Sequence, residues 1–129
     1  MQKSEEIGKL TTAMVAALSE MSHPVKNKVN PHFKNRYADL LAVVDCSREA
    51  LLKHGLCVLQ VPEGLGVANM IIHESGEYLY FQATMPDAPQ KFGSGLTYLR
   101  RYGMQGLTQL VAEEDDDAEA TRVTEKDDW

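Results

Sequence analysis

The chain has 129 residues, 43% hydrophobic and 25% charged, the composition of one modest soluble domain with its own core. Its longest apolar runs are too short to span a bilayer, and an N-terminus with acidic Glu5 and Glu6 shows no secretion signal, so we expect a cytoplasmic protein. The net charge of −6 is uneven: residues 113–129 hold nine acidic and two basic side chains (−7), and the other 112 residues hold ten and eleven (+1). The acidic average therefore does not exclude nucleic acid as a partner.

Two helices are expected in the first half of the chain. Apolar residues recur at helical spacing over residues 4–21, with Ser4 and Glu6 as N-terminal signals, and Pro24 stops this helix. The polar segment 25–36 is typical of a loop. A second helix is expected over residues 37–54, with Asp39 in its first turn and Gly55 as its C-terminal stop. Its apolar face comprises Leu40, Val43, Val44 and Leu51, with Leu41 and Leu52 as further candidates.

The second half of the chain predicts strands and one more helix. Three strands fit residues 56–62, 66–74 and 77–85, and the glycine turns between them indicate antiparallel hairpins. A helix should then run over residues 94–110, where its glycines need a reason such as close packing on the sheet. Its helical wheel places two sets on opposite sides: Leu96, Leu99, Gly103, Gly106, Leu107 and Leu110 on one, and Thr97, Arg100, Arg101, Met104 and Thr108 on the other.

These elements predict an α+β fold, with helices packed on a three-stranded antiparallel sheet and a disordered acidic C-terminal tail. The predicted domain covers residues 1–112 and the tail residues 113–129. Cys46 and Cys57 lie in apolar segments without metal-ligand spacing, so we expect buried free thiols.

The segment 26–37 is the first candidate for contact with a nucleic acid. Its cations could follow a phosphate backbone while Phe33 or Tyr37 stacks on a base. The alternative is a solvated loop whose aromatic residues anchor it to the core, and Tyr37 suits that role because it opens the expected helix. The candidate cations are Lys26, Lys28, Lys34 and Arg36.

Residues 93–117 combine Tyr98, Arg100, Arg101 and Tyr102 on one expected helix with an acidic run directly behind them. Arginines beside aromatic rings suit phosphates and exposed base faces, which makes single-stranded nucleic acid the first partner to consider. The adjacent arginines could form a phosphate clamp, with Thr97 on the same side of the helix. Alternatively, they form intramolecular salt bridges to Glu or Asp. The segment 93–95 could bind an anion through its main-chain N–H groups or act as a plain helix cap.

The acidic run 113–117 raises the alternative of a Mg²⁺-dependent nuclease. Consecutive carboxylates rarely converge on one metal, and solvated acids are the simpler interpretation. The histidines show no ligand spacing, and neither a phosphate-binding loop nor a nucleophile motif is present, so we expect no cofactor and no enzymatic activity. The segment 125–129 resembles the acidic-aromatic tip by which bacterial single-strand-binding proteins recruit partners; the alternative is a featureless tail.

Taken together, residues 33–40, Gly55, Gln60, residues 93–102 and the acidic run 113–117 resemble the ERF (essential recombination function) family of phage single-strand annealing proteins. The resemblance covers nearly all of residues 10–118 and implies a β-β-β-α core. It also implies ATP-independent binding and annealing of single-stranded DNA in phage recombination, by ring or helical homo-oligomers in the bacterial cytoplasm. A host single-strand-binding protein or an exonuclease is a further candidate partner. The rival interpretation is a module that recruits host proteins through its acidic tail and binds DNA weakly.

Overall fold

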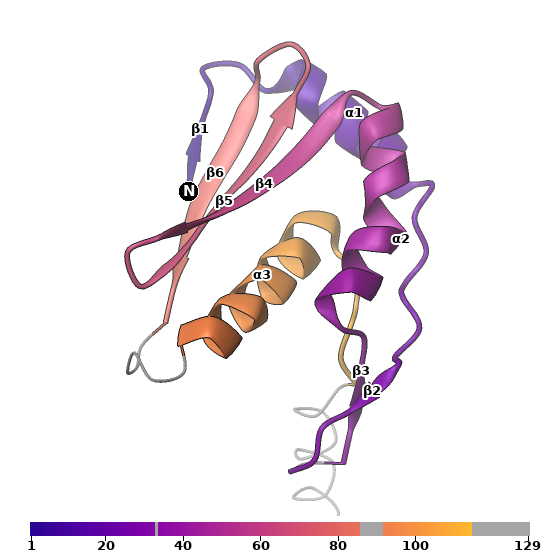
Figure 1. Cartoon of the computed structure of the whole chain (residues 1–129). Helices are drawn as coiled ribbons and strands as arrows, with labels where there is room; N and C mark the ends of the chain where they lie inside the picture. The colour runs from indigo at the N-terminus through magenta and orange to yellow at the C-terminus, as the bar shows by residue number, and fades with distance from the viewer. Residues whose placement is uncertain (33, 86–91, 115–129) are drawn as a thin grey trace, which may run out of the picture.

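A four-stranded antiparallel sheet forms one layer of the computed structural model, which describes residues 1–32, 34–85 and 92–114 (Figure 1). The strands are β1 (Gln2–Lys3), β4 (Leu56–Glu63), β5 (Gly66–His73) and β6 (Tyr78–Thr84), in the order β1-β6-β5-β4. The hairpins joining the long strands turn at Gly64 and Gly76, whose φ angles of 59° and 92° suit glycine. The three long strands match the prediction.

The expectation of three strands was wrong because a fourth, β1, pairs with β6. The Ser4 hydroxyl, expected to begin the first helix, instead accepts a hydrogen bond from the main-chain N–H of Tyr78 at 2.9 Å. The first helix, α1, therefore covers only Gly8–Leu18 and has no side-chain cap at its start. Two residues carry no alternation that a sequence pattern could detect.

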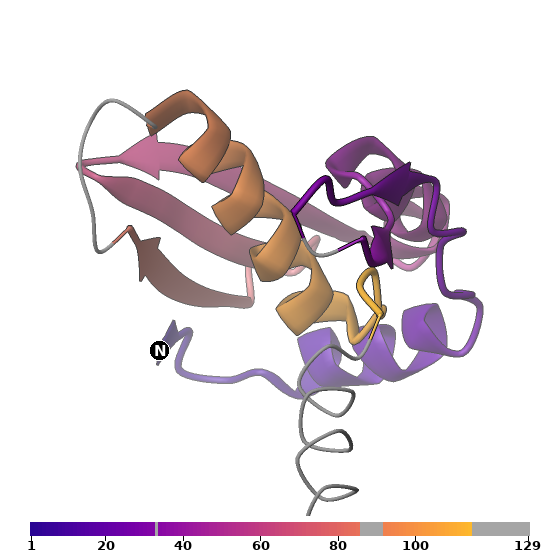
Figure 2. The same cartoon turned by 90° about the horizontal axis from the view of Figure 1, so that it is seen from below.

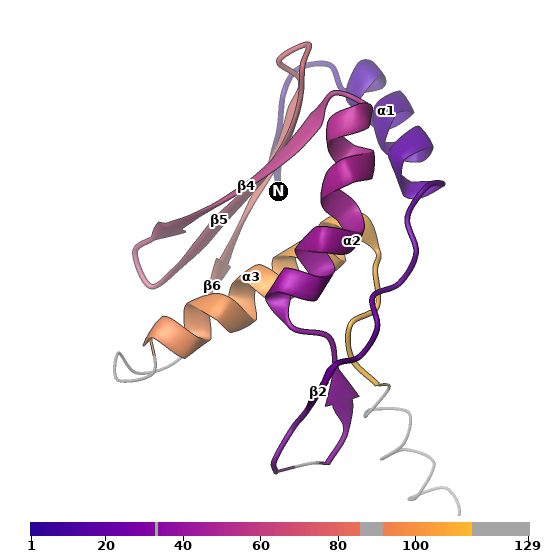
Figure 3. The same cartoon turned by 45° about the vertical axis from the view of Figure 1, so that its right-hand side comes forward.

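All three helices pack on one face of the sheet (Figure 3). The second, α2, covers Leu40–Lys53, and the third, α3, covers Phe92–Thr108. α2 begins three residues later than expected because Asp39 is its N-cap, accepting a hydrogen bond from the Ala42 N–H at 3.0 Å, and Tyr37 belongs to a strand. Within the described residues, no helix is long and apolar enough to cross a membrane.

Two apolar clusters hold the helices in place. One joins α1 and α2 to the sheet through Leu10, Leu51 and Ile71; the other joins α2 to α3 through Val43 and Met104. The expected faces of α3 were partly wrong, since Met104 and Thr108 are buried while Gly106 is exposed. α3 lies between the sheet and α2 and so buries two sides of its surface. On α2, the candidates Leu41 and Leu52 are exposed.

A small hairpin replaces the loop expected before α2. It consists of β2 (Lys28–Val29) and β3 (Arg36–Tyr37), and it projects beyond the end of α2 (Figure 3). The chain after α3 turns at Gln109, which has a φ of 61°, and comes back to this hairpin. There the Ala38 N–H donates to the Ala112 carbonyl at 2.7 Å, and the Glu114 N–H donates to the Arg36 carbonyl at 3.2 Å. The start of the acidic run is thus bound to the basic hairpin.

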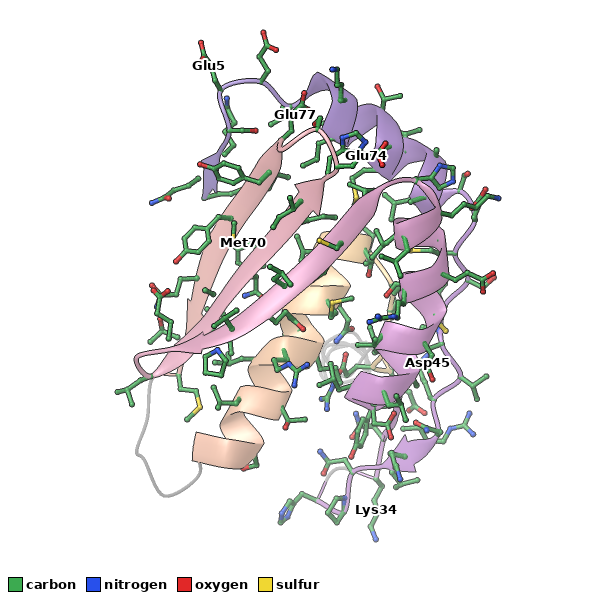
Figure 4. All side chains as sticks on the ribbon, turned by 45° about the horizontal axis from the view of Figure 1, so that its top comes forward. Glu5, Lys34, Asp45, Met70, Glu74 and Glu77 are labelled. Atoms are coloured by element: carbon green, nitrogen blue, oxygen red, sulfur yellow. The ribbon has the colours of Figure 1, made fainter. Side chains whose placement is uncertain are left out.

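The other face of the sheet carries no helix; Figure 4 looks toward it, with Met70 near the middle. The register of β4, β5 and β6 places an uncharged row of Leu59, Met70 and Tyr80 across it. We call this surface the open sheet face; its neighbouring rows add Cys57, Ile72, Tyr78, Val61, Ala68 and Gln82. Cys46 and Cys57 are free but only half-buried, which corrects the expectation of buried thiols.

Candidate nucleic-acid interface

A groove of about 540 Å³ lies between the β2–β3 hairpin and α3. Figure 2 shows α3 lying across the sheet, with the hairpin beside it on the right. This hairpin–α3 groove brings together two segments that the sequence suggested separately, the basic segment before α2 and the Tyr-Arg block of α3. Its lining includes Asn30, Asn35, Tyr37, Thr97, Tyr98, Arg101, Tyr102 and Glu113.

Arg101 occupies the middle of this groove, among three tyrosine rings. Its guanidinium carbon lies 4.7 Å from the ring centroid of Tyr37, 5.8 Å from that of Tyr98 and 5.7 Å from that of Tyr102. All three distances are within the range of cation–π attraction. Helical spacing places Tyr98 and Tyr102 one turn apart, with centroids 4.4 Å apart, so α3 supplies two walls and β3 the third.

The charge of Arg101 is already paired. Its Nε donates a hydrogen bond to Glu113 Oε1 at 2.7 Å, and the two side chains are only 15% and 20% exposed. The structure therefore shows for Arg101 the intramolecular salt bridge that the sequence left open as an alternative. Such a partly buried pair is costly to break, because each charge would lose its partner in a place with little water.

A weaker pair lies beside it on the hairpin. Arg36 Nε donates to Glu114 Oε1 at 3.3 Å, with side chains 66% and 42% exposed. Solvent screens a pair of this exposure, so its contribution to stability is small. The first two acids of the acidic run thus both contact arginines that the sequence proposed as DNA ligands.

Burial in this groove raises the pKa of Tyr102 well above its usual range. A hydrogen bond with Tyr98 and the nearby charge of Glu113 act in the same direction, and Arg101 opposes them. Tyr102 therefore stays a neutral phenol to high pH, and the groove keeps a hydrogen-bonding aromatic wall.

The lysine candidates before α2 differ in exposure. Lys28 and Lys34 are exposed and Lys26 is half-buried; Lys34 lies beside the turn between β2 and β3, at the far end from the body (Figure 4). Lys28 is directly opposite Tyr37 in the hairpin, so both side chains point to the same face. On α3, Thr97 and Tyr98 are exposed along the groove. Phe33 lies outside the described residues.

Arg100 and Arg101 do not share a cavity. A step of one residue turns a helix by about 100°, and Arg100 lines a second cavity, between α3, α2 and β4. Arg48, which the sequence did not single out, lines the same cavity from α2. No sequence signal distinguishes Arg48 from any other exposed helical arginine, since its neighbour Arg100 is brought to it only by the fold.

The position of α3 depends on a close approach to the sheet at Gly103. A Cβ there would overlap Asn69 Oδ1 and approach Gln60 Nε2. Asn69 is fully buried, and Gln60 Nε2 donates to Asn69 Oδ1 and to the Arg100 carbonyl, both at 2.8 Å. Close packing on the sheet thus explains Gly103, as expected, but not Gly106, around which a Cβ would meet open space.

The part of the chain that the structure describes contains no group of three or more metal-ligating side chains. Of the acidic run, Glu113 and Glu114 contact arginines, and residues 115–117 lie outside that part. The predicted tail and its 125–129 tip lie outside it as well.

Comparisons with known proteins give one family. Searches among curated proteins and among solved structures gave no significant match. The family model described as the ERF superfamily matches residues 10–128, which is nearly the whole chain and includes both the β2–β3 hairpin and α3. The chain therefore belongs to the ERF superfamily.

Proposed function

We propose that this protein binds single-stranded DNA and anneals complementary strands in phage recombination, without ATP. Membership of the ERF superfamily supports a recombination role in a phage context. The observation that carries the proposal is the hairpin–α3 groove, where exposed Tyr98 lies near a hairpin that carries exposed Lys28 and Lys34. Aromatic faces beside flexible cations bind single strands without reading their sequence.

In this mechanism, cations hold the backbone and aromatic rings hold some of the bases. The backbone ligands are Lys26, Lys28, Lys34, Arg36, Arg100 and Arg101, and Tyr98 and Phe33 stack on bases. A strand held extended with its base edges exposed finds register with a complement more easily, because the protein cations reduce repulsion between the two backbones. No covalent bond changes, so the activity needs no catalytic residue. Arg101 must exchange Glu113 for phosphate before it can take part.

The open sheet face supports the homo-oligomer that accompanies this proposal. Leu59 and Val61 are 46% and 53% exposed there, and the three central rows carry no charged side chain. A phosphate backbone has nothing to bind on such a surface, whereas a second copy of the chain would bury it, as two sheets pack face to face. Leu59→Lys should therefore reduce the mass of the assembly in light scattering. Leu41→Lys, the same replacement at a more exposed leucine on α2, should not.

The annealing activity is tested with two complementary dye-labelled oligonucleotides, mixed with the protein without ATP and followed by fluorescence. A pairing rate well above the spontaneous rate, which saturates as the strands become coated, is the expected result. Binding without acceleration would replace annealing by a protective or recruiting role. Products that require Mg²⁺ and disappear with EDTA would indicate the nuclease alternative.

The recruitment alternative is tested by deleting residues 115–129. This truncation keeps Glu113 and Glu114, which contact the folded body. An annealing protein should keep or gain DNA affinity, because a competing polyanion is removed. A recruitment module should lose its protein partner while its weak DNA binding stays the same.

A further inference from the structure

A second cavity, of about 270 Å³, is lined by a different side of α3 from the one that faces the hairpin–α3 groove. We call it the α2–β4 pocket, because α2 and β4, the edge strand of the sheet, form its two sides. Its lining is mostly apolar and includes Val44, Leu51, Val58 and Met104, and Ser47 and Gln60 add polar groups. A ligand that enters it must therefore present an uncharged, mostly apolar group.

Two arginines lie at this pocket, one from each helix. Arg48 on α2 and Arg100 on α3 are both exposed. Neither guanidinium group forms an ion pair or a hydrogen bond with any described residue. They differ in this from Arg36 and Arg101, which contact Glu114 and Glu113. Two unneutralised guanidinium groups beside an apolar cavity suit a ligand with a flat apolar body and an anionic group on each side.

The size of the pocket limits that ligand to one ring system. Sites that enclose drug-sized molecules measure roughly 300–1,000 Å³, slightly more than this cavity. The pocket is also held in shape, since Gln60 on β4 ties the strand to the main chain of α3 through the Arg100 carbonyl at 2.8 Å. Because that carbonyl can only accept, the amide nitrogen of Gln60 must face it, and Gln60 Oε1 remains as an acceptor.

We propose that the α2–β4 pocket receives one base of the bound single strand, with the neighbouring phosphates on Arg48 and Arg100. This inference rests on the proposed DNA binding and adds a subsite to it. The strand then passes over α3, from the tyrosines of the hairpin–α3 groove on one side to the pocket on the other. The strand would cross α3 at Arg100 and Arg101, which are adjacent in the sequence and line different cavities.

The test uses a short single-stranded oligonucleotide that carries 2-aminopurine at several positions, bound to the full chain. A base inside the pocket is shielded from acrylamide, so part of the 2-aminopurine fluorescence should resist quenching. Leu52→Trp should abolish this protected fraction, because Leu52 lines the pocket, is half exposed and can accept an indole over the opening. The variant keeps both arginines, so the salt dependence of binding should persist.

The arginines are tested separately by affinity. Arg48→Ala should weaken binding about five- to tenfold and reduce the slope of log affinity against log salt by about 0.7. Lys9→Ala removes the same charge from the exposed side of α1 and should leave both values unchanged. Equal effects of Arg48→Ala and Lys9→Ala would overturn the subsite, as would complete acrylamide quenching of 2-aminopurine in the wild-type complex. In both cases the hairpin–α3 groove could still bind DNA. Absence of binding by the wild type would overturn the proposed function as well.

Discussion

Arg100 and Arg101 are neighbours in the sequence, yet the two sides of α3 give them different surroundings. Arg101 lies among three tyrosine rings and pairs with Glu113 in a place that is largely closed to water. Arg100 is exposed at the α2–β4 pocket and forms no ion pair with the residues that the structure describes. The adjacent arginines are therefore not equivalent as candidate DNA ligands.

This difference shows that the surroundings of a helical cation decide whether it pairs within the fold or is free to bind a ligand. An arginine with a partly buried partner is costly to remove, because the partner's charge is left uncompensated, and it reaches a ligand only by giving that partner up. An unpaired, exposed arginine contributes little to stability and is available to an anion at once. Four sets of measurements test the surroundings that the structure gives to the two sides of α3.

The largest expected effect is on stability. Arg101→Ala leaves Glu113 without its partner and removes the cation from three rings, so the free energy of unfolding should fall by about 2–3 kcal/mol. Arg100→Ala should change it by less than about 0.5 kcal/mol. Denaturant unfolding of the two variants measures both values, and equal losses would end the distinction between the two sides of α3.

Next in size is the contact of α3 with the sheet. Gly103→Ala places a methyl group against Asn69 Oδ1 and should destabilise the fold by about 1–3 kcal/mol. Gly106→Ala, one turn along the same helix in open space, should stabilise it by about 0.5–1 kcal/mol through higher helix propensity. Thermal unfolding gives the sign of each change; destabilisation at Gly106 would contradict this placement of α3.

A smaller effect is expected on DNA affinity. Glu113→Gln removes the carboxylate that neutralises Arg101, so single-stranded DNA should bind about threefold more tightly, with a salt slope steeper by about 0.7. Fluorescence anisotropy at several salt concentrations measures both. Glu49→Gln, an exposed acid on α2 with no ion pair in the described structure, is the control for the change in net charge. A gain no larger than that of the control would mean that Arg101 serves the fold alone.

The smallest effect concerns pH. Because burial raises the pKa of Tyr102, the folded protein holds this proton more tightly than the unfolded chain does. The resulting stabilisation is complete below the ordinary tyrosine pKa of about 10 and is lost as the pH rises through the higher folded value. Tyr102→Phe should weaken this alkaline loss of stability in denaturant unfolding across that range. An identical pH profile in both proteins would remove Tyr102 as its source.

Local patterns were sufficient for the three long strands of the sheet. The alternation in β4, β5 and β6 and the glycines at their turns are properties of short segments, so the sequence predicted these strands closely. The two-residue strands β1, β2 and β3 were missed because each is defined by a partner elsewhere in the chain. The buried side of α3 was predicted as one stripe, and a second neighbour, α2, buried Met104 as well.

The candidate site was predictable as a set of residue types and not as an arrangement. Tyr98, Thr97 and the hairpin cations were named from composition and spacing, and the fold brings the hairpin to α3. The pairing of Arg101 with Glu113 depends on the turn at Gln109, which has a positive φ. A glutamine gives no sequence signal for such a backbone conformation. Arg48 was not found, because only the packing of α2 against α3 brings it to the same cavity as Arg100.

The hydrogen bond from the Glu114 N–H to the Arg36 carbonyl fixes where the acidic run leaves the body. The three aspartates that follow are attached at the hairpin, so their effective concentration there is set by the chain and not by the amount of protein in solution. Under the proposed DNA binding, these aspartates would act as a tethered competitor that dilution cannot relieve. Added DNA would then meet the same internal competition at every protein concentration.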